Sequence, residues 1–321
     1  MWFWLSLITL LCWSGSDLFS KIGCRDADDK LSHLKMVIAV GTVMGLHAAF
    51  EIFVSGTPIS WSVIWTYLPV SLLYIGSMAL GYLGLRYIEL SVSSPICNSS
   101  GALVAVLTLL FVGGDDYSPL ALCAILLVCA GAIGLGVVDA TEDPELRAER
   151  QKDGNYKYAK SFLALALPVA YCLLDAAGTF ADNRVLEVLT DRFYQGGVSS
   201  SLKDCADLAA ASANCAYELT FLAAAVVCFI YVVLIRKDTL IPRLEGPKYL
   251  GAVCETAGQF AYIYAISDTS HLAMSAPIIS SYCAASVLWS RLFLKEKLSW
   301  KHYGMIGLIV IGIALMGMLD L

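Results

Sequence analysis

The sequence predicts an all-α integral membrane protein with ten transmembrane helices, arranged as two inverted repeats of five helices each. Three observations support this prediction. Only 15% of the 321 residues are charged, whereas soluble domains contain about 25%. Long stretches of the chain carry almost no charge and match the roughly 20 apolar residues that a helix needs to cross a bilayer. Short motifs also recur in the same order in both halves of the chain.

Ten segments are long and apolar enough to cross a bilayer. The first begins at Met1, lacks a positively charged leading region and contains Asp17, so we expect it to be a retained helix and not a cleaved signal peptide. Most connections between segments are short. The predicted spans are 2–22, 32–54, 64–87, 91–112, 118–138, 160–182, 212–235, 247–266, 271–293 and 301–319.

A densely charged stretch at 139–159 divides the chain into two halves. We expect a first repeat at 1–138, a solvated linker at 139–159 and a second repeat at 160–321. The second repeat carries a long loop insertion at 183–211. Because each half has an odd number of helices, consecutive halves enter the membrane from opposite sides. Such inverted repeats are typical of secondary transporters, whose sites lie near the middle of the bilayer.

Two matches indicate that the halves are duplicates. LSVSSPI at 90–96 corresponds to LAMSAPI at 272–278. Asp17 in the first helix corresponds to Asp175 in the sixth. The glycine-rich fifth and tenth helices also correspond, and we expect them to pack closely as structural support. Their matching glycines are Gly131, Gly136, Gly312 and Gly317.

Positive charge predicts the orientation of the chain. Of the 21 Lys and Arg residues, all but Arg184, Arg192 and Lys203 fall on one side of the predicted topology. The positive-inside rule places that side in the cytoplasm, so both termini and the 183–211 loop are predicted to be extracytoplasmic, in a plasma or inner membrane. Cys205 and Cys215 would then face an oxidising compartment, where a disulfide can persist. Two unpaired thiols are the alternative, and the other nine cysteines lack metal-ligand spacing.

Three acids inside apolar segments are the main functional candidates, because an ionisable group in a membrane helix is costly and marks a site by default. Asp17 and Asp175 each follow an aromatic residue by four positions. Asp17 could instead pair with Lys21 one turn later, and Asp175 could bond to neighbouring hydroxyl or backbone groups. Glu255 lies near the middle of its segment and has no charged partner within it, as a proton-coupling acid requires.

Aromatic and small polar residues accompany these acids. Trp13, Tyr171 and Tyr262 are expected to form the walls of a cavity. Asn98 and Ser281 follow prolines in helices four and nine, where a bent helix can expose polar groups to a cavity. Acids and aromatic rings without an intramembrane Lys or Arg favour a cation, because aromatic faces attract ammonium groups. The tyrosines could equally hydrogen-bond a neutral metabolite.

The sequence resembles the drug/metabolite transporter superfamily in its ten-helix EamA-type branch. The resemblance lies in CWSGSDLFSK (12–21), the repeated LxxSxPI motif and LKEKLSWKHYGMIGLIVIGIALMG (294–317). Glu296 stands at the acidic position of the last stretch, and Asp115 stands near the equivalent position of the first half. The resemblance implies a transporter fold but no particular substrate. Better-known ten-helix members are thought to have cytoplasmic termini, opposite to the orientation that the charges predict.

Asp17 also resembles the essential acid in the first helix of the small multidrug resistance proteins. That resemblance implies proton-coupled movement of a cationic compound. We therefore expect a secondary active transporter, working by alternating access on a small cationic or zwitterionic metabolite or drug-like compound. The predicted substrate and proton site contains Glu255, Asp17, Asp175, Trp13, Tyr171, Tyr262, Ser281 and Asn98.

Two other functions remain open at this point. A carrier of a neutral or anionic metabolite, such as an amino acid or sugar derivative, would need a cation in the cavity, for which Arg86 is the candidate. A lipid-handling or sensor membrane protein would show no solute flux. We expect no enzyme and no cofactor, since the sequence has no nucleophile–base pair, metal-ligand cluster or phosphate loop. A nucleic-acid partner is not expected, because no basic stripe is present, and a homodimer is left open.

Overall fold

The computed structural model describes residues 1–26, 28–88, 90–111, 118–141, 163–267, 269–295 and 298–319. All regular structure within these ranges is helical, as the sequence predicts. Nearly all of the predicted linker at 139–159, together with Asp115 and Glu296, lies outside the described residues.

The helices follow the predicted segments closely. The first half contains α1 (Trp2–Cys24), α2 (Ser32–Phe50), α3 (Trp61–Tyr87), α4 (Leu90–Cys97), α5 (Ser100–Phe111) and α6 (Pro119–Ala140). The second half contains α8 (Leu163–Gln195), α9 (Leu202–Phe229), α10 (Pro242–Ile266), α11 (Leu272–Ser280), α12 (Tyr282–Phe293) and α13 (Trp300–Leu319). Short π-helices extend α2 over Glu51–Ser55 and α9 over Ile230–Ile235, and a 3₁₀ turn at Thr269–His271 precedes α11.

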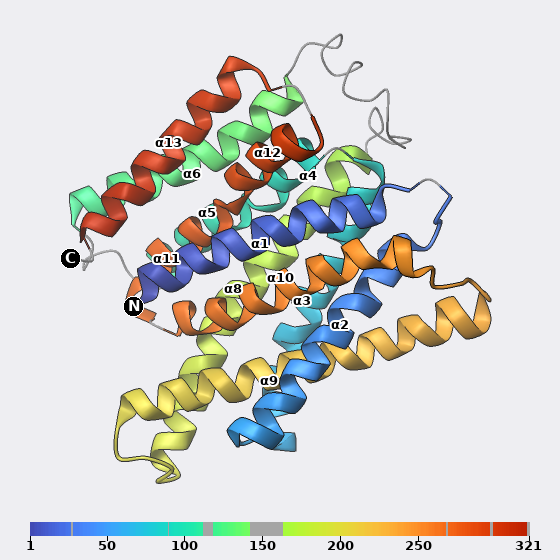
Figure 1. Cartoon of the computed structure of the whole chain (residues 1–321). Coiled ribbons are helices and arrows are strands. Elements are labelled where there is room, and N and C mark those ends of the chain that lie inside the picture. The colour runs from blue at the N-terminus through green and yellow to red at the C-terminus, as the bar shows by residue number, and fades with distance from the viewer. Residues whose placement is uncertain are drawn as a thin grey trace.

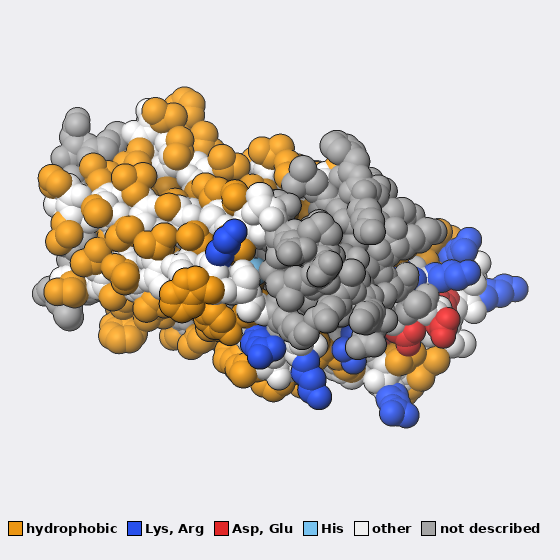
Figure 2. All heavy atoms as spheres, turned by 90° about the horizontal axis from the view of Figure 1, so that it is seen from above, with side chains coloured by type: hydrophobic (Ala, Val, Ile, Leu, Met, Phe, Trp, Pro, Cys, Tyr) orange, Lys and Arg blue, Asp and Glu red, His pale blue; other side chains and the backbone are white. Residues whose placement is uncertain are grey.

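The protein is an integral membrane protein with several spanning helices. Within the described residues, seven helical stretches are long and apolar enough to cross a bilayer. They cover Trp2–Cys24, Ser32–Ser55, Trp61–Tyr87, Ser93–Phe111, Pro119–Val138, Leu202–Ile235 and Leu272–Phe293. Many large apolar side chains also point outward, and hydrophobic atoms cover much of the left of Figure 2. A surface of this kind is stable only against lipid or another apolar partner.

Two helices are interrupted where the prolines lead us to expect a bend. The fourth predicted span is divided into α4 and α5 at 98–99, and the ninth into α11 and α12 at Ser281. Pro95 and Pro277 lie near the end of α4 and α11. Proline offers no N–H and crowds the carbonyl one turn earlier. The backbone closes each break with a single turn, in which Asn98 N–H donates to Ser94 O at 2.9 Å and Ser281 N–H to Pro277 O at 3.0 Å.

Helices far apart in sequence pack in pairs (Figure 1). α1 lies along α10 and α3 along α8, while α2 packs on α9 and α6 on α13. The α6–α13 pair is close because two of the predicted glycines face the partner helix. A Cβ added at Gly131 would lie 2.5 Å from Ile309 Cγ1, and one at Gly312 would lie 2.6 Å from Val128 Cγ2. These glycines therefore allow the close packing that the sequence predicts.

The predicted loop insertion at 183–211 is wrong. α8 continues to Gln195 and α9 begins at Leu202, so the connection covers only 196–201. The helices extend because their inner faces remain apolar, with Leu186 and Leu189 almost fully buried. Ser201 caps α9 by accepting a hydrogen bond from Asp204 N–H.

The predicted disulfide between Cys205 and Cys215 is also wrong, since both cysteines are free. Both lie on α9, ten residues apart. A helix rises 1.5 Å per residue, which separates their Cα atoms by about 15 Å. A disulfide joins Cα atoms only about 4.4–6.8 Å apart, so one straight helix cannot bridge them.

Candidate functional site

A cavity lies in the middle of the helix bundle and is lined by residues from both halves of the chain. It encloses about 910 Å³ of empty space, a volume that includes the open solvent at its mouth. Seven of the eight predicted site residues line it: Glu255, Asp17, Asp175, Trp13, Tyr171, Tyr262 and Asn98.

Asp17 accepts hydrogen bonds from two serines on different helices. Ser94 Oγ of α4 donates to Asp17 Oδ2 at 2.5 Å, and Ser286 Oγ of α12 donates to the same oxygen at 2.8 Å. The Lys21 ammonium donates instead to the carbonyls of Leu85 and Ile88 at the end of α3, both at 2.7 Å. The geometry therefore points Lys21 toward α3 and ties Asp17 to both broken helices.

Asp175 and Glu255 approach the same cavity from α8 and α10. Ser100 Oγ at the start of α5 donates to Asp175 Oδ2 at 2.7 Å. Ser16 of α1 lines the cavity together with Glu255. Serine hydroxyls thus donate to both Asp17 and Asp175. A hydroxyl can donate to a carboxylate or accept from a protonated acid, so these sites can hold either form.

Aromatic rings form much of the wall. The Trp13 and Tyr262 ring centroids are 5.1 Å apart, and Tyr282 packs edge-on against Trp13 at 5.8 Å. Trp13 Nε1 also donates to the backbone carbonyl of Glu255 at 3.3 Å. Gly258 makes room for this indole, because a Cβ there would lie 2.4 Å from Trp13 Cδ1. Trp13 and Tyr262, two of the three predicted wall residues, are therefore held by direct contacts between α1 and α10.

No Lys, Arg or His is found among the described residues that line the cavity. Arg86, the predicted cation for an anionic substrate, directs its guanidinium to the backbone carbonyl of Asp29 and to Ser32 Oγ, the latter at 2.9 Å. The charge of the cavity lining in the described part of the chain is consequently acidic.

Ser281 is not among the described residues that line the cavity. Its side chain is 1% exposed and donates to Ile278 O at 2.5 Å. The preceding Ser280 lines the cavity instead. α11 ends at Ser280, and one residue of helix changes the direction of a side chain by about 100°.

The sequence analysis missed a second acidic group that lies directly behind the cavity. We call Asp182, Tyr67, Tyr74, Tyr262 and Thr179 the Asp182 cluster. Tyr67 Oη donates to Asp182 Oδ1 at 2.6 Å, and Tyr74 Oη to Asp182 Oδ2 at 3.3 Å. Asp182 is 0% exposed. Its spacing of seven residues from Asp175 puts both acids near one face of α8, and that spacing was the available sequence signal.

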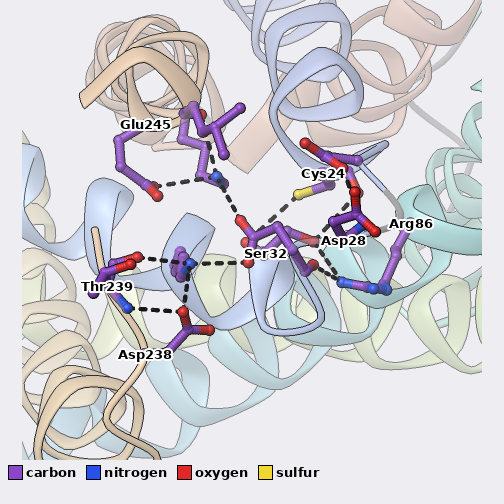
Figure 3. Close-up of polar contacts among 12 residues, drawn as sticks. Cys24, Asp28, Ser32, Arg86, Asp238, Thr239 and Glu245 are labelled. Carbon is purple, nitrogen blue, oxygen red and sulfur yellow. Dashed lines mark hydrogen bonds and ion pairs between the residues drawn. The ribbon is translucent and has the colours of Figure 1, made fainter. Parts of the chain in front are cut away.

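A third group of charged residues, the Asp29 cluster, surrounds the connection between α1 and α2, and Figure 3 shows Ser32, Arg86, Asp238 and Glu245 in it. Asp29 forms ion pairs with Lys35 at 2.9 Å and with Lys248 at 3.2 Å. Each lysine has a further acid nearby, since Asp238 lies 3.4 Å from Lys35 and Glu245 lies 3.2 Å from Lys248. We define the cluster by these five residues together with Arg86, Ser32 and Lys21.

Burial alone would raise the pKa of Asp29, which lies in the connection between α1 and α2. The hydrogen bond from Lys35 and the positive charges of Lys248 and Lys35 outweigh this effect, so the pKa of Asp29 falls below its ordinary value. Asp29 is therefore ionised at neutral pH. The Asp29 cluster is held by charge, whereas the Asp182 cluster is held by hydroxyl groups.

The fold and the cavity define a class: a helical, multi-pass membrane protein with a central pocket of acids and aromatic rings. The model of the EamA-like transporter family matches residues 210–318. The resemblance to this branch of the drug/metabolite transporters is therefore confirmed over that part of the chain, which carries α10 to α12, most of α9 and nearly all of α13.

Comparison with solved structures supports the fold over the whole chain. A structure described only as "Crystal structure of protein" matches with a TM-score of 0.60 and 14% sequence identity. The match covers 98% of this chain and 96% of that chain. No curated protein matches the sequence.

Proposed function

We propose that this protein is a proton-coupled secondary transporter of a small cationic or zwitterionic metabolite or drug-like compound. One observation carries the proposal: three acids and several aromatic rings share one central cavity, whose described lining has no basic side chain. An ammonium group can pair with a carboxylate and lie against the face of Trp13 or a tyrosine. The EamA-like match at 210–318 supports the transporter class.

The proposed architecture is ten spanning helices in two inverted repeats, 1–138 and 160–321. The helix pairs support it. Exchanging each helix with its counterpart in the other half turns the α1–α10 pair into the α8–α3 pair and leaves α2–α9 and α6–α13 unchanged. This pairing is what a two-fold axis in the membrane plane would produce. The two halves would then rock around the shared cavity and open it to each side in turn.

The proposed orientation places both termini outside the cytoplasm. Lys and Arg side chains gather mainly toward the right of Figure 2, the side on which the 25–31 and 236–241 connections lie (Figure 1). The connection at 196–201 lies at the opposite end. Ser200 is exposed there, so a Ser200→Cys variant should react with an impermeant thiol reagent from the outside of intact cells. Labelling from the cytoplasmic side alone would reverse the topology.

Substrate binding tests the central proposal. Purified protein is screened for binding of organic amines and of amino and sugar acids, followed by flux into liposomes with an imposed proton gradient. Glu255→Gln keeps the shape of the side chain but removes its negative charge. We expect amine affinity to fall about tenfold or more, because a charged hydrogen bond contributes about 1.5–3 kcal/mol. Glu187→Gln, a partly exposed acid of α8, is the matched control and should bind amines normally.

Other outcomes would point to the alternative functions. If Arg86→Gln abolished binding of an anionic metabolite while Glu255→Gln did not, the protein would be an anion carrier. If lipid copurified in the cavity and no member of the panel crossed the membrane under a proton gradient, a lipid-handling role would replace transport.

A further inference from the structure

The Asp182 carboxyl is buried but has no basic partner in the part of the chain that the structure describes. Its two oxygens accept hydrogen bonds from Tyr67 Oη at 2.6 Å and Tyr74 Oη at 3.3 Å. A buried carboxylate without a cation is costly. Binding a proton removes this charge, so the position suits a group that changes its protonation state.

The neighbouring groups do not supply a compensating positive charge. On α8 itself, Asp175 lies two turns toward the cavity, while Arg184 is paired with Glu187 at 2.8 Å. From α10, Tyr262 presents its hydroxyl, and from α9, the Tyr217 ring packs edge-on against Tyr74 at 5.9 Å. The groups near Asp182 from α3 and α10 are thus phenols, and the α9 residue packed against Tyr74 is a phenol whose hydroxyl bonds to Met78 Sδ.

A continuous set of hydroxyl groups joins Asp182 to the cavity. Tyr74 Oη contacts both Tyr262 Oη and Thr179 Oγ1, the latter at 3.2 Å, and Tyr262 Oη lies 3.3 Å from the same threonine. These three residues line the cavity. Tyr262 also stacks on Trp13, whose indole bonds to the backbone of Glu255. Asp182 is therefore one hydroxyl away from the cavity wall.

We propose that Asp182 is a second proton-binding residue of this transporter, and that its protonation reorients the Tyr74 and Tyr262 hydroxyls that face the substrate. This inference rests on the proposed function for the role of the cavity but not for the proton site itself. An ionised carboxylate only accepts hydrogen bonds, whereas a protonated one must also donate. When a proton from water binds Asp182, one tyrosine must become an acceptor.

Tyr74 is the residue that can make this change. Its hydroxyl has two other acceptors, Tyr262 Oη and Thr179 Oγ1, so it can turn its own proton toward the cavity and accept from Asp182. Loss of the proton to water reverses the change, and no other bond is made or broken. The cavity wall consequently offers a different hydrogen-bonding pattern to the substrate in each protonation state.

Infrared spectroscopy tests the proton site without requiring transport. Difference spectra of the purified protein in liposomes, between mildly alkaline and mildly acidic buffer, should contain the C=O band of a protonated carboxyl that is absent from Asp182→Asn. Tyr67→Phe should keep this band but shift it, because one hydrogen bond to the carboxyl is lost. Asp191→Asn, which removes an exposed acid of the same helix, should leave it unchanged. An unaltered spectrum for Asp182→Asn would overturn the proposal.

A flux measurement tests the coupling. With a gradient of about one pH unit, worth a factor of about ten per coupled proton, Asp182→Asn should lower proton-driven accumulation of the amine about tenfold. Amine affinity at fixed pH should fall much less than accumulation does, because Asp182 itself does not line the cavity. Equal loss of affinity and accumulation would make Asp182 a structural or substrate-binding residue. If the wild type bound no amine, the proposed function would fail, while the infrared band would still decide whether Asp182 binds a proton.

Discussion

The Asp29 cluster and the Asp182 cluster lie at opposite sides of the cavity, and each stabilises a buried carboxyl group in a different way. At one, Asp29 meets two lysines, and the carbonyl of its own residue accepts from Arg86. At the other, the side-chain partners of Asp182 among the described residues are hydroxyl groups. A paired carboxylate keeps its charge over a wide pH range, but one held by phenols can lose it. The contacts of Asp29 therefore depend on charge, whereas the contacts of Asp182 can be changed by a single proton.

The clusters also occupy positions that suit these roles. Lys21 and Arg86 of the Asp29 cluster directly follow Ser20 and Leu85, which line the cavity. The Asp182 cluster shares Tyr74, Tyr262 and Thr179 with the lining itself. If the protein opens to each side in turn, as proposed above, the ion pairs of the Asp29 cluster must separate, while the hydroxyl groups of the Asp182 cluster need only to rearrange.

The largest loss of stability is expected when the ion pairs of Asp29 are removed. Asp29→Ala leaves Lys35 and Lys248, whose side chains are 4% and 0% exposed, without their shared carboxylate. Breaking a buried pair costs about 3–5 kcal/mol. We expect the lower end, about 3 kcal/mol, because Asp238 and Glu245 still face the two lysines. Thermal unfolding in detergent measures the loss. Asp28→Ala, one residue earlier and exposed, is the control. Equal Tm values for the two variants would contradict the stabilising role of the Asp29 ion pairs.

Acid should weaken the same ion pairs, but by less than Asp29→Ala does, since protonation removes only the charge of Asp29. The folded-state pKa of Asp29 lies below its ordinary value of 3.8. Its contribution to stability is therefore fully present above about pH 3.8 and is lost as the pH falls through the folded-state pKa. The difference in Tm between wild type and Asp29→Ala should stay constant near neutral pH and shrink below about pH 4. A difference that already shrank at neutral pH would show that another group is responsible.

In the Asp182 cluster, removal of one hydroxyl should cause an intermediate loss of stability. Tyr67→Phe deletes the 2.6 Å donor to buried Asp182, and we expect a loss of about 2 kcal/mol when a buried acid loses such a partner. Tyr82→Phe is the matched control, because the buried Tyr82 hydroxyl has no hydrogen-bond partner within the described ranges. That variant should change the free energy of unfolding by less than about 0.5 kcal/mol. The result would count against the assignment if Tyr82→Phe were the more damaging change.

The helices could be predicted from sequence because apolar length determines them directly. The predicted span 2–22 became Trp2–Cys24, and the span 247–266 ends at the same residue as α10. The acids of the cavity were also accessible, since Asp17, Asp175 and Glu255 interrupt apolar stretches. The end of α8 was missed, because its polar residues after Asp182 are typical of a loop, and only burial of Leu186 and Leu189 reveals the helix.

The two clusters could not be predicted, since their partners come from distant parts of the chain. Asp29 and Lys248 are 219 positions apart, and Tyr67 and Asp182 are 115 apart. An acid at the end of a predicted span is ordinarily solvated at the membrane surface. Only the packing of α3 and α9 against α8 shows that Asp182 is enclosed. Ser280 lines the cavity in the place where the sequence analysis expected Ser281. The exact position of the helix break decides this, and no residue pattern reveals it.

The smallest effect is expected at an ion pair on α8 that belongs to neither cluster. Arg184 and Glu187 are 2.8 Å apart, but their side chains remain 41% and 37% exposed. Water screens such a pair, and exposed pairs contribute about 0–1 kcal/mol. Glu187→Gln should therefore lower the free energy of unfolding by less than about 0.5 kcal/mol, with less effect at high salt. Unfolding in detergent at low and high salt provides the measurement. A loss as large as that of Asp29→Ala would mean that burial is not what separates the strong contacts of this protein from the weak ones.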